Sequence, residues 1–464
     1  MIESKESSEV LGQGGLKARR EVFVETVCEA LAAGDDGTLR LILNDEHAAD
    51  LAELVRVLEE EAGQRCMGLL EDRLSARVMA ELDPAMAAQV AADLDERALA
   101  GLVGEMAPDA AADVLADLPE DRSDEVLALL PPEDAAELQD LMEHPEDTGG
   151  GIMTSRLVAV PREVTVSRAV DLLRAWAEEE EILTVFVVDE EHRLVGTVSL
   201  RRMLLANREA TMEQLADREP MTVRADMDQE EIAAIFSDYD LLALPVVDEH
   251  DELIGQVTVD DIVDVIHEEA TEDNLKMAAT SSREMEDPSI PGVVRRRLPW
   301  LLLCLAGTLL TGGVLDLFSG VLASLSPLVL FVPAIMAMGG NSGIQTSTVT
   351  VRALATGTLP RGRVGPALWR ELGAAAGIGL LLGSIVFMVA HLWTDGSPVA
   401  PSAGLAMFAA VLLSAGVGAV IPLSFRATGI DPAVASGPLI TTLNDILSLV
   451  IYFGVAGLLL RWTA

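Results

Sequence analysis

Apolar residues recur at helical spacing over residues 21–146, a region rich in Ala, Leu and acids. A short step returns there every twelve residues, with Leu or Met standing just before a Pro or an acid: Leu82-Asp83-Pro84, Leu94-Asp95-Glu96, Met106-Ala107-Pro108, Leu118-Pro119-Glu120 and Leu130-Pro131-Pro132. Pro and acids are typical of the first turn of a helix, so one short helix is expected per step. Stacked short helices bury a core through their neighbours, which predicts an α-helical superhelical N-terminal domain.

Beyond this region, period-two apolar segments form a second repeat. The matching segments lie fifty-nine positions apart, at 184–189 and 194–199 in the first copy and at 243–248 and 253–258 in the second. Each copy predicts strand, turn, strand and helix, preceded by an amphipathic helix over 167–178 or 229–238. The repeat resembles a tandem pair of α/β cystathionine-β-synthase (CBS) domains.

After Pro291 come five apolar segments long enough to span a bilayer, near 298–320, 327–351, 368–393, 403–424 and 436–460. Basic residues precede the first segment, or lie between the second and third or the fourth and fifth: Arg295, Arg296, Arg297, Arg352, Arg361, Arg363, Arg370 and Arg426. The remaining loops carry no Lys or Arg. The positive-inside rule therefore predicts a multi-pass protein of the cytoplasmic (inner) membrane, with the N-terminus in the cytoplasm and the C-terminus outside.

The expected fold is multidomain, ending in an all-α transmembrane domain of five helices. The expected limits are a disordered N-terminus over 1–20, the acidic helical repeat over 21–148, CBS domains over 149–212 and 213–272, a connecting helix over 273–297 and the membrane domain over 298–464.

The chain holds 32 Lys and Arg against 75 Asp and Glu, a net charge of −43, which excludes a nucleic-acid partner bound through phosphate neutralisation. Residues 295–464 contain nine Arg and five acids, so the acidity lies in the first 294 residues. It is explained either by adaptation to salt or by cation sites. Three separated cysteines and no CxxC pair indicate neither disulfides nor zinc. Residues 1–15 lack a signal-peptide pattern, so the acidic part is expected to stay cytoplasmic.

Asp445 lies well inside the fifth span with no obvious basic partner, which predicts a role in an ion pathway. Asp431 is a second candidate acid of this ion pathway, expected to begin the same helix on nearly the same face. The alternative is a plain helix cap before Pro432. In the second span, residues 338–347 predict a break whose carbonyls, near Gly340 and Asn341, turn inward. The alternative is a close helix crossing through small residues.

These features together resemble the MgtE family of magnesium channels. The resemblance rests on Asp147-Thr148-Gly149-Gly150-Gly151-Ile152-Met153-Thr154, the CBS pair, and spans containing Pro333, Gly339-Gly340-Asn341-Ser342-Gly343-Ile344-Gln345 and Asp431-Pro432, and it covers the chain past residue 20. It implies a homodimer with one pore on its axis, lined by the second and fifth spans. Mg²⁺ keeps several waters and takes few carboxylates, so Asp445 from both subunits with carbonyls near Gly340 and Asn341 would suit it.

The resemblance also implies a "plug" helix after the CBS pair and regulatory magnesium at acids of the soluble part. The matching acids are Asp109, Asp113, Asp240, Asp261, Asp264, Glu269, Glu272 and Asp273. In the second CBS copy, Thr258 and Asp261 match the Thr-x-x-Asp that holds a nucleotide ribose, whereas the first copy has Ser199-Leu200-Arg201-Arg202. One adenine-nucleotide site, for ATP, is implied at most, and a helix cap by Thr258 explains the pattern equally well.

The resulting hypothesis is a magnesium-selective channel or transporter gated by intracellular Mg²⁺. It is not an enzyme, since no nucleophile, base or redox pattern is present. One alternative is a membrane-anchored CBS sensor of nucleotides or ions. Another is transport of Co²⁺, Mn²⁺ or Zn²⁺, which the absence of clustered Cys and His disfavours.

Overall fold

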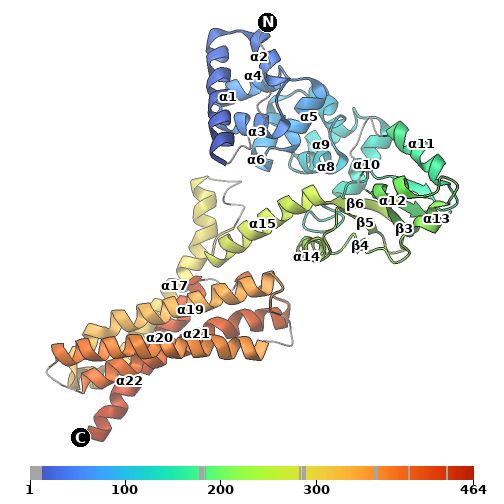
Figure 1. Cartoon of the computed structure of the whole chain (residues 1–464). Helices are drawn as coiled ribbons and strands as arrows, with labels where there is room; N and C mark the ends of the chain where they lie inside the picture. The colour runs from blue at the N-terminus through green and yellow to red at the C-terminus, as the bar shows by residue number, and fades with distance from the viewer. Residues whose placement is uncertain are drawn as a thin grey trace. The chain divides into compact units, whose positions relative to one another are not determined.

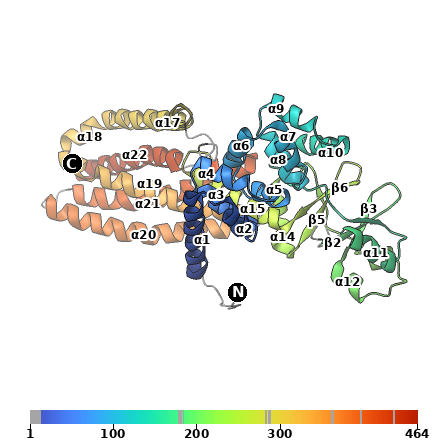
Figure 2. The same cartoon turned by 90° about the horizontal axis from the view of Figure 1, so that it is seen from above.

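The computed structural model describes residues 13–176, 182, 184–281, 284, 289–359, 364–394, 398–434 and 437–463. The chain divides into two compact units, one up to Val265 and one from Ile266 onward. The first unit contains a stack of short helices and two small sheets, and the second contains a bundle of long helices (Figures 1 and 2).

The helical stack confirms the predicted N-terminal domain. Its helices are α1 (Gln13–Ala33), α2 (Asp36–Leu43), α3 (Ala48–Val57), α4 (Glu60–Met67), α5 (Asp72–Ala80), α6 (Pro84–Asp93), α7 (Glu96–Val103), α8 (Pro108–Ala116), α9 (Glu120–Leu127) and α10 (Pro132–Met142). Helices α6 to α10 start twelve residues apart, as the repeat predicts, and α5 starts twelve residues before α6. Asp83 and Asp95 cap α6 and α7 by accepting from the backbone N–H of Met86 and Ala98. The apolar residue of each step faces the core, as Met106 does at 2% exposure.

Residues 13–20 are helical, so the expected disorder over 1–20 is wrong for that stretch, and residues 1–12 lie outside the described residues. Arg20 Nε lies 2.8 Å from an Asp50 carboxylate oxygen, and Arg19 pairs with Glu46. Contacts between α1 and α2 also help to hold α1 in place.

Each CBS copy forms a three-stranded mixed sheet. The first contains β1 (Ala159–Pro161), β2 (Thr184–Val188) and β3 (Leu194–Ser199), and the second contains β4 (Val223–Arg224), β5 (Ala243–Val247) and β6 (Leu253–Thr258). In each, the first pair of strands is parallel and the second antiparallel. The leading strands β1 and β4 were not predicted, because two or three residues are too few to show period-two alternation.

The helices of this part agree with the predicted pattern. They are α11 (Val166–Trp176), α12 (Leu200–Leu205), α13 (Met212–Leu215), α14 (Gln229–Tyr239) and α15 (Val259–Met277). The end of the predicted helix over 167–178 lies outside the described residues. The expected limit between 272 and 273 falls inside α15, because helical residues continue without a break to Met277.

The glycine run after α10 joins the chain to the second CBS copy. Gly149 N–H donates to the carbonyl of Met227 at 2.7 Å, and Gly150 N–H donates to that of Ala225 at 2.8 Å. A Cβ atom on Gly149 would lie 2.7 Å from the carbonyl oxygen of Arg224, so only glycine fits so close to the strand. The run is therefore a docking segment for the β4 region.

The second unit contains α17 (Ile290–Leu317), α18 (Ser319–Ser324), η1 (Ser326–Phe331), α19 (Val332–Ala355), α20 (Val364–Trp393), α21 (Val399–Thr428), η3 (Pro432–Val434) and α22 (Gly437–Thr463). Five helical segments are long and apolar enough to cross a membrane: Ile290–Leu317, Ser326–Ala355, Val364–Trp393, Val399–Thr428 and Gly437–Arg461. They lie together as one helical bundle (Figures 1 and 2), which confirms the all-α membrane domain.

The expected break over residues 338–347 is wrong, because α19 is helical throughout. Its glycines lie at helix crossings instead. A Cβ atom on Gly339 would lie 2.4 Å from Ser448 Oγ, and one on Gly343 would lie 2.0 Å from Asn444 Nδ2, both on α22. Gly418 of α21 approaches the Gly343 backbone equally closely. The small-residue alternative is therefore correct: close approach of three helices, and not an open backbone, explains these glycines.

Candidate functional site

Helix α22 presents two polar faces. Asn444 and Ser448 are fully buried and face α19, whereas Asp445 is partly exposed. Adjacent residues of an α-helix point about 100° apart, so the contact of Asn444 with α19 turns Asp445 toward the outside of the single chain. Within the described part of the chain, Asp445 has no ion pair and no hydrogen bond to its side chain. A carboxylate within a membrane span is expected to face a partner or a water-filled path.

Helix α19 places further polar groups on an exposed face. Asn341 and Gln345 are exposed and lie one turn apart. Gly340 is buried, and a Cβ atom on it would lie 3.5 Å from Thr441 Cγ2 of α22. Helices α19 and α22 contact each other directly. In the described part of the bundle, the second and fifth spans thus both carry polar side chains that are exposed or partly exposed.

Asp431 does not begin the same helix as Asp445, contrary to expectation. It precedes the 3₁₀ turn η3, and α22 starts only at Gly437. Its Oδ1 accepts from the backbone N–H of Ala433 at 2.8 Å, which is the capping role considered as the alternative. Pro432 begins a short turn in place of the long helix, which places Asp431 in the linker between α21 and α22.

In the first unit, Asp109 and Asp261 are brought together from distant parts of the sequence. Asp109 lies in the first turn of α8, and its Oδ1 is buried with no hydrogen-bond partner among the described residues. Asp261 lies in the first turn of α15, where its Oδ2 accepts from Thr258 N–H at 3.4 Å and from Thr258 Oγ1. The Thr258–Asp261 pair is thus a helix cap, as one interpretation of the sequence suggests.

The charged forms of the Asp109 and Asp261 carboxyl groups are both disfavoured. Burial, followed by the negative charge of Asp109, raises the pKa of Asp261 to about 7, although hydrogen bonds from Thr258 oppose the rise. Burial also raises the pKa of Asp109, against hydrogen bonding by Thr154 and the positive charge of Arg156. A cation near this pair would offset both burial and repulsion.

The remaining predicted acids of the first unit are more open. Asp113 is exposed one turn after Asp109, Asp264 is exposed on α15, and Asp240 is exposed at the C-terminal end of α14 with left-handed φ of 52°. Within the described residues, no three His, Cys, Asp or Glu side chains gather as a complete metal site.

A charged cluster forms in the second unit where α15 contacts the α21–α22 linker. Lys276 Nζ lies 2.8 Å from Glu272 Oε1 and 2.8 Å from Asp431 Oδ2. Asp273 and Arg352 line a small cavity of about 140 Å³ beside this cluster, together with Ala270, Asn274, Met277 and Val351. Glu269 is partly buried one turn before Asp273.

The role of Lys276 was not predicted from the sequence, although this residue lies four positions after Glu272 and no other Lys follows residue 17.

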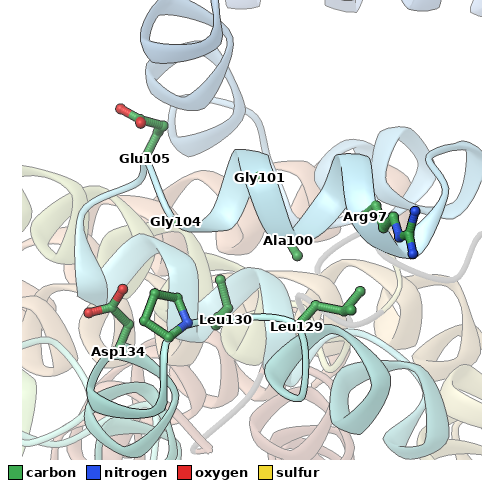
Figure 3. Close-up of a pocket in the computed structure, with 9 residues that line it drawn as sticks. Arg97, Ala100, Gly101, Gly104, Glu105, Leu129, Leu130 and Asp134 are labelled. Atoms are coloured by element: carbon green, nitrogen blue, oxygen red, sulfur yellow. The ribbon is translucent and has the colours of Figure 1, made fainter.

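A larger groove, of about 500 Å³, lies in the helical stack between α7 and the start of α10 (Figure 3). Gly101 and Gly104 form part of its wall, Leu129 and Leu130 contribute apolar surface, and Arg97, Glu105 and Asp134 place charges around it. None of the acids predicted for ion binding lines this groove.

The helical stack, the CBS pair and the membrane helices each match a known protein family. Residues 332–455 match the MgtE divalent cation transporter family, residues 46–147 match the MgtE intracellular N domain, and residues 150–209 and 212–268 match CBS domains. The magnesium transporter MgtE of Bacillus subtilis is 37% identical over 320 residues, which cover 69% of this chain and 71% of that protein. The chain belongs to the MgtE family of magnesium transporters.

Other relatives agree with this assignment. The magnesium transporter MgtE of Thermus thermophilus is 37% identical over 332 residues, covering 70% of this chain and 73% of that protein. The crystal structure of the soluble part of a magnesium transporter is 30% identical, with a TM-score of 0.51, and covers 54% of this chain and 99% of that chain. The crystal structure of the cytosolic domain of the Mg²⁺ channel MgtE in complex with ATP is 36% identical, with a TM-score of 0.50. The match covers 52% of this chain and 99% of that chain.

Membership in MgtE confirms the family suggested by the sequence motifs. The family consists of transporters and not enzymes. The chain is a membrane protein with five candidate spans and a cytosolic N-terminal part.

Proposed function

We propose that this chain is a magnesium-selective channel of the cytoplasmic membrane that works as a homodimer and closes when intracellular Mg²⁺ binds its acidic soluble part. The observation that carries the pore assignment is Asp445, a carboxylate deep in α22 that lies outside the covered interior of its own bundle. A second subunit facing this surface would place two such carboxylates across a shared axis, and Asn341 and Gln345 of α19 would line the same path.

Mg²⁺ fits such a path because it gives up its waters reluctantly. Two Asp445 carboxylates supply the charge that a divalent cation requires, while amide and carbonyl oxygens can bind its water shell. Since α19 is an unbroken helix, its backbone carbonyls near Gly340 are engaged along the helix. The exposed amide of Asn341 is therefore the better candidate for the second contact with the ion.

For regulation, the pair Asp109–Asp261 is the strongest candidate in the first unit. Asp109 has a buried oxygen without a partner among the described residues, and the two carboxylates repel each other. These residues fit a hydrated divalent cation, which would supply the missing positive charge and hold α8 against the start of α15. Asp113, Asp240, Asp264, Glu269 and Asp273 stay predicted contributors to other regulatory sites.

ATP is a second candidate ligand, at Thr258 and Asp261. A relative's cytosolic domain is known in complex with ATP, which supports the proposal. In this chain the two side chains bond each other. A ribose hydroxyl would thus have to replace the Thr258 hydroxyl as the donor to Asp261, and nucleotide binding would weaken the cap of α15.

Ion flux through the purified full chain in liposomes tests this function. We expect Mg²⁺ uptake down its gradient, reported by an enclosed Mg²⁺-sensitive dye, and slower uptake when Mg²⁺ on the side of the soluble part is raised. Parallel arms with Co²⁺, Mn²⁺ and Zn²⁺ decide the ion. Faster flux of one of these would favour the alternative cargo, and no divalent flux at all would favour a membrane-anchored sensor.

A further inference from the structure

Lys276 is unusual in this sequence. The chain contains 29 Arg but three Lys, and Lys276 is the only Lys beyond Lys17. It lies near the C-terminal end of α15, at the contact with the α21–α22 linker. Lysine differs from arginine in carrying a compact point charge with three donors, and not a wide planar fork. A cation that must fit between one oxygen of each of two carboxylates is better supplied by the compact ammonium of lysine.

The geometry around Lys276 resembles that of an ion held between two elements. Its ammonium bonds Glu272 on its own helix and Asp431 of the linker, each at 2.8 Å. The second oxygen of Asp431 is held by the backbone N–H of Ala433, so the carboxylate cannot turn away without losing the η3 cap. Mg²⁺ would require oxygens at about 2.0–2.1 Å from its own centre, in the space that the ammonium fills.

The neighbouring charges support this arrangement. Burial lowers the pKa of Lys276, but hydrogen bonds to Asp431 and Glu272 and their negative charges outweigh it and raise the pKa above its ordinary value. The neighbouring carboxyl group of Asp273 is disfavoured in its charged form. Burial and the charge of Asp431 raise its pKa, and the positive charges of Lys276 and Arg352 only partly compensate.

We propose that Lys276 is a built-in cation that takes the place of a divalent ion between α15 and the α21–α22 linker, so that Glu272 and Asp431 are not magnesium ligands in this chain. The contact then forms without Mg²⁺, and regulation by Mg²⁺ acts elsewhere. This inference modifies the regulatory set of the proposed function but does not depend on conduction, because it concerns what the two carboxylates bind.

Counting bound Mn²⁺ on the purified full-length chain tests this inference. Mn²⁺ prefers the same carboxylate and water ligands as Mg²⁺ and can be measured by equilibrium dialysis with the EPR signal of the free ion. We expect Asp431→Asn and Glu272→Gln to bind as many Mn²⁺ ions per chain as the wild type. Glu25→Gln, an exposed acid on α1, is the control for the loss of one negative charge. Loss of a bound ion in Asp431→Asn or Glu272→Gln, but not in the control, would overturn the proposal.

The converse variant, Lys276→Met, keeps most of the apolar stem and removes the charge. With Glu272, Asp273 and Asp431 then left without their ammonium, about one additional Mn²⁺ per chain should bind there. The added ion should disappear in the double variant Lys276→Met/Asp431→Asn. A Lys276→Met chain that folds and gains no ion would show that the ammonium does not occupy a cation site. If this variant does not fold, the Mn²⁺ counts of Asp431→Asn and Glu272→Gln still test the proposal. Absence of Mg²⁺ flux in liposomes would refute the proposed channel but not this inference.

Discussion

Asn444 of α22 lies directly against Gly343 of α19, so closely that a Cβ atom at position 343 would stand 2.0 Å from Asn444 Nδ2. The same Cβ would lie 2.9 Å from Ile440 Cγ2. Neither side chain of the partner helix has room to retreat, since both residues are fully buried. This contact sets the rotation of α22 and with it the direction of Asp445.

Gly343→Ala should therefore destabilise the helix bundle by on the order of 1–3 kcal/mol, the usual cost of forcing an extra methyl group into a packed core. Thermal unfolding of the purified protein in detergent measures it. Gly373→Ala on α20 is the matched control, since a Cβ there meets nothing within 4 Å. The double variant Gly343→Ala/Asn444→Ala should regain part of the loss, and equal midpoints for both glycine variants would contradict the close crossing.

Asp445→Asn keeps the shape of the side chain and removes its charge. We expect Mg²⁺ flux in liposomes to fall by about tenfold or more, equivalent to losing about 1.4 kcal/mol of ion stabilisation, while the protein keeps its thermal midpoint. Asp316→Asn near the end of α17 is the control for loss of an acid in the membrane domain. Flux equal to that of the wild type in Asp445→Asn would refute the pore assignment.

Asp109→Asn should raise stability at pH 8 in the absence of Mg²⁺. The folded pKa of Asp261, about 7, lies above its unfolded value near 4, so the folded state holds a proton that the unfolded state releases between those pH values. Stability from this group is thus greatest below pH 4 and declines as pH rises toward 7. Removing the charge of Asp109 lowers the pKa of Asp261 and reduces the decline, by on the order of 1 kcal/mol.

Thermal unfolding of the full chain between pH 4 and 8 measures this effect, with Glu125→Gln, an exposed acid of α9, as the control. If Mg²⁺ binds the pair, it should raise the midpoint of the wild type at pH 8 more than that of Asp109→Asn, since ligand binding to the folded state alone adds stability. Identical Mg²⁺-dependent shifts in the two proteins would place the regulatory ion elsewhere.

Arg122 of α9 connects its own step of the helical stack to the end of α6, three steps earlier in the sequence. Its Nη2 donates to the carbonyls of Ala91 and Leu94 at the C-terminal end of α6. Arg122→Met should destabilise the protein by about 1–3 kcal/mol, because partly buried carbonyls lose their donor. Arg97→Met is the control: among the described residues, Arg97 has no ion pair or side-chain hydrogen bond. Unfolding in urea should separate the two variants, and a smaller loss for Arg122→Met would contradict this role.

The elements and their order could be predicted from the amino-acid pattern alone. The twelve-residue step predicted the starts of α6 to α10, because helix caps are local: Asp83 and Asp95 bond backbone groups three residues ahead. Period-two alternation identified β2, β3, β5 and β6, and apolar length identified the five spans, because bilayer thickness sets that length. The family motifs could also be recognised from the sequence, since they depend on residue identity alone.

The roles of the polar and glycine residues depend instead on contacts between helices that are distant in the sequence. Three glycines in one stretch of α19 predict a broken helix from local propensity, but contacts with Asn444 and Ser448 of α22 and with Gly418 of α21 keep the helix intact. The partnership of Asp109 with Asp261, and that of Lys276 with Asp431, joins residues more than 150 positions apart. Charge interactions depend on distance in space, which no spacing along the chain encodes, so these pairs became visible only once the helices were packed.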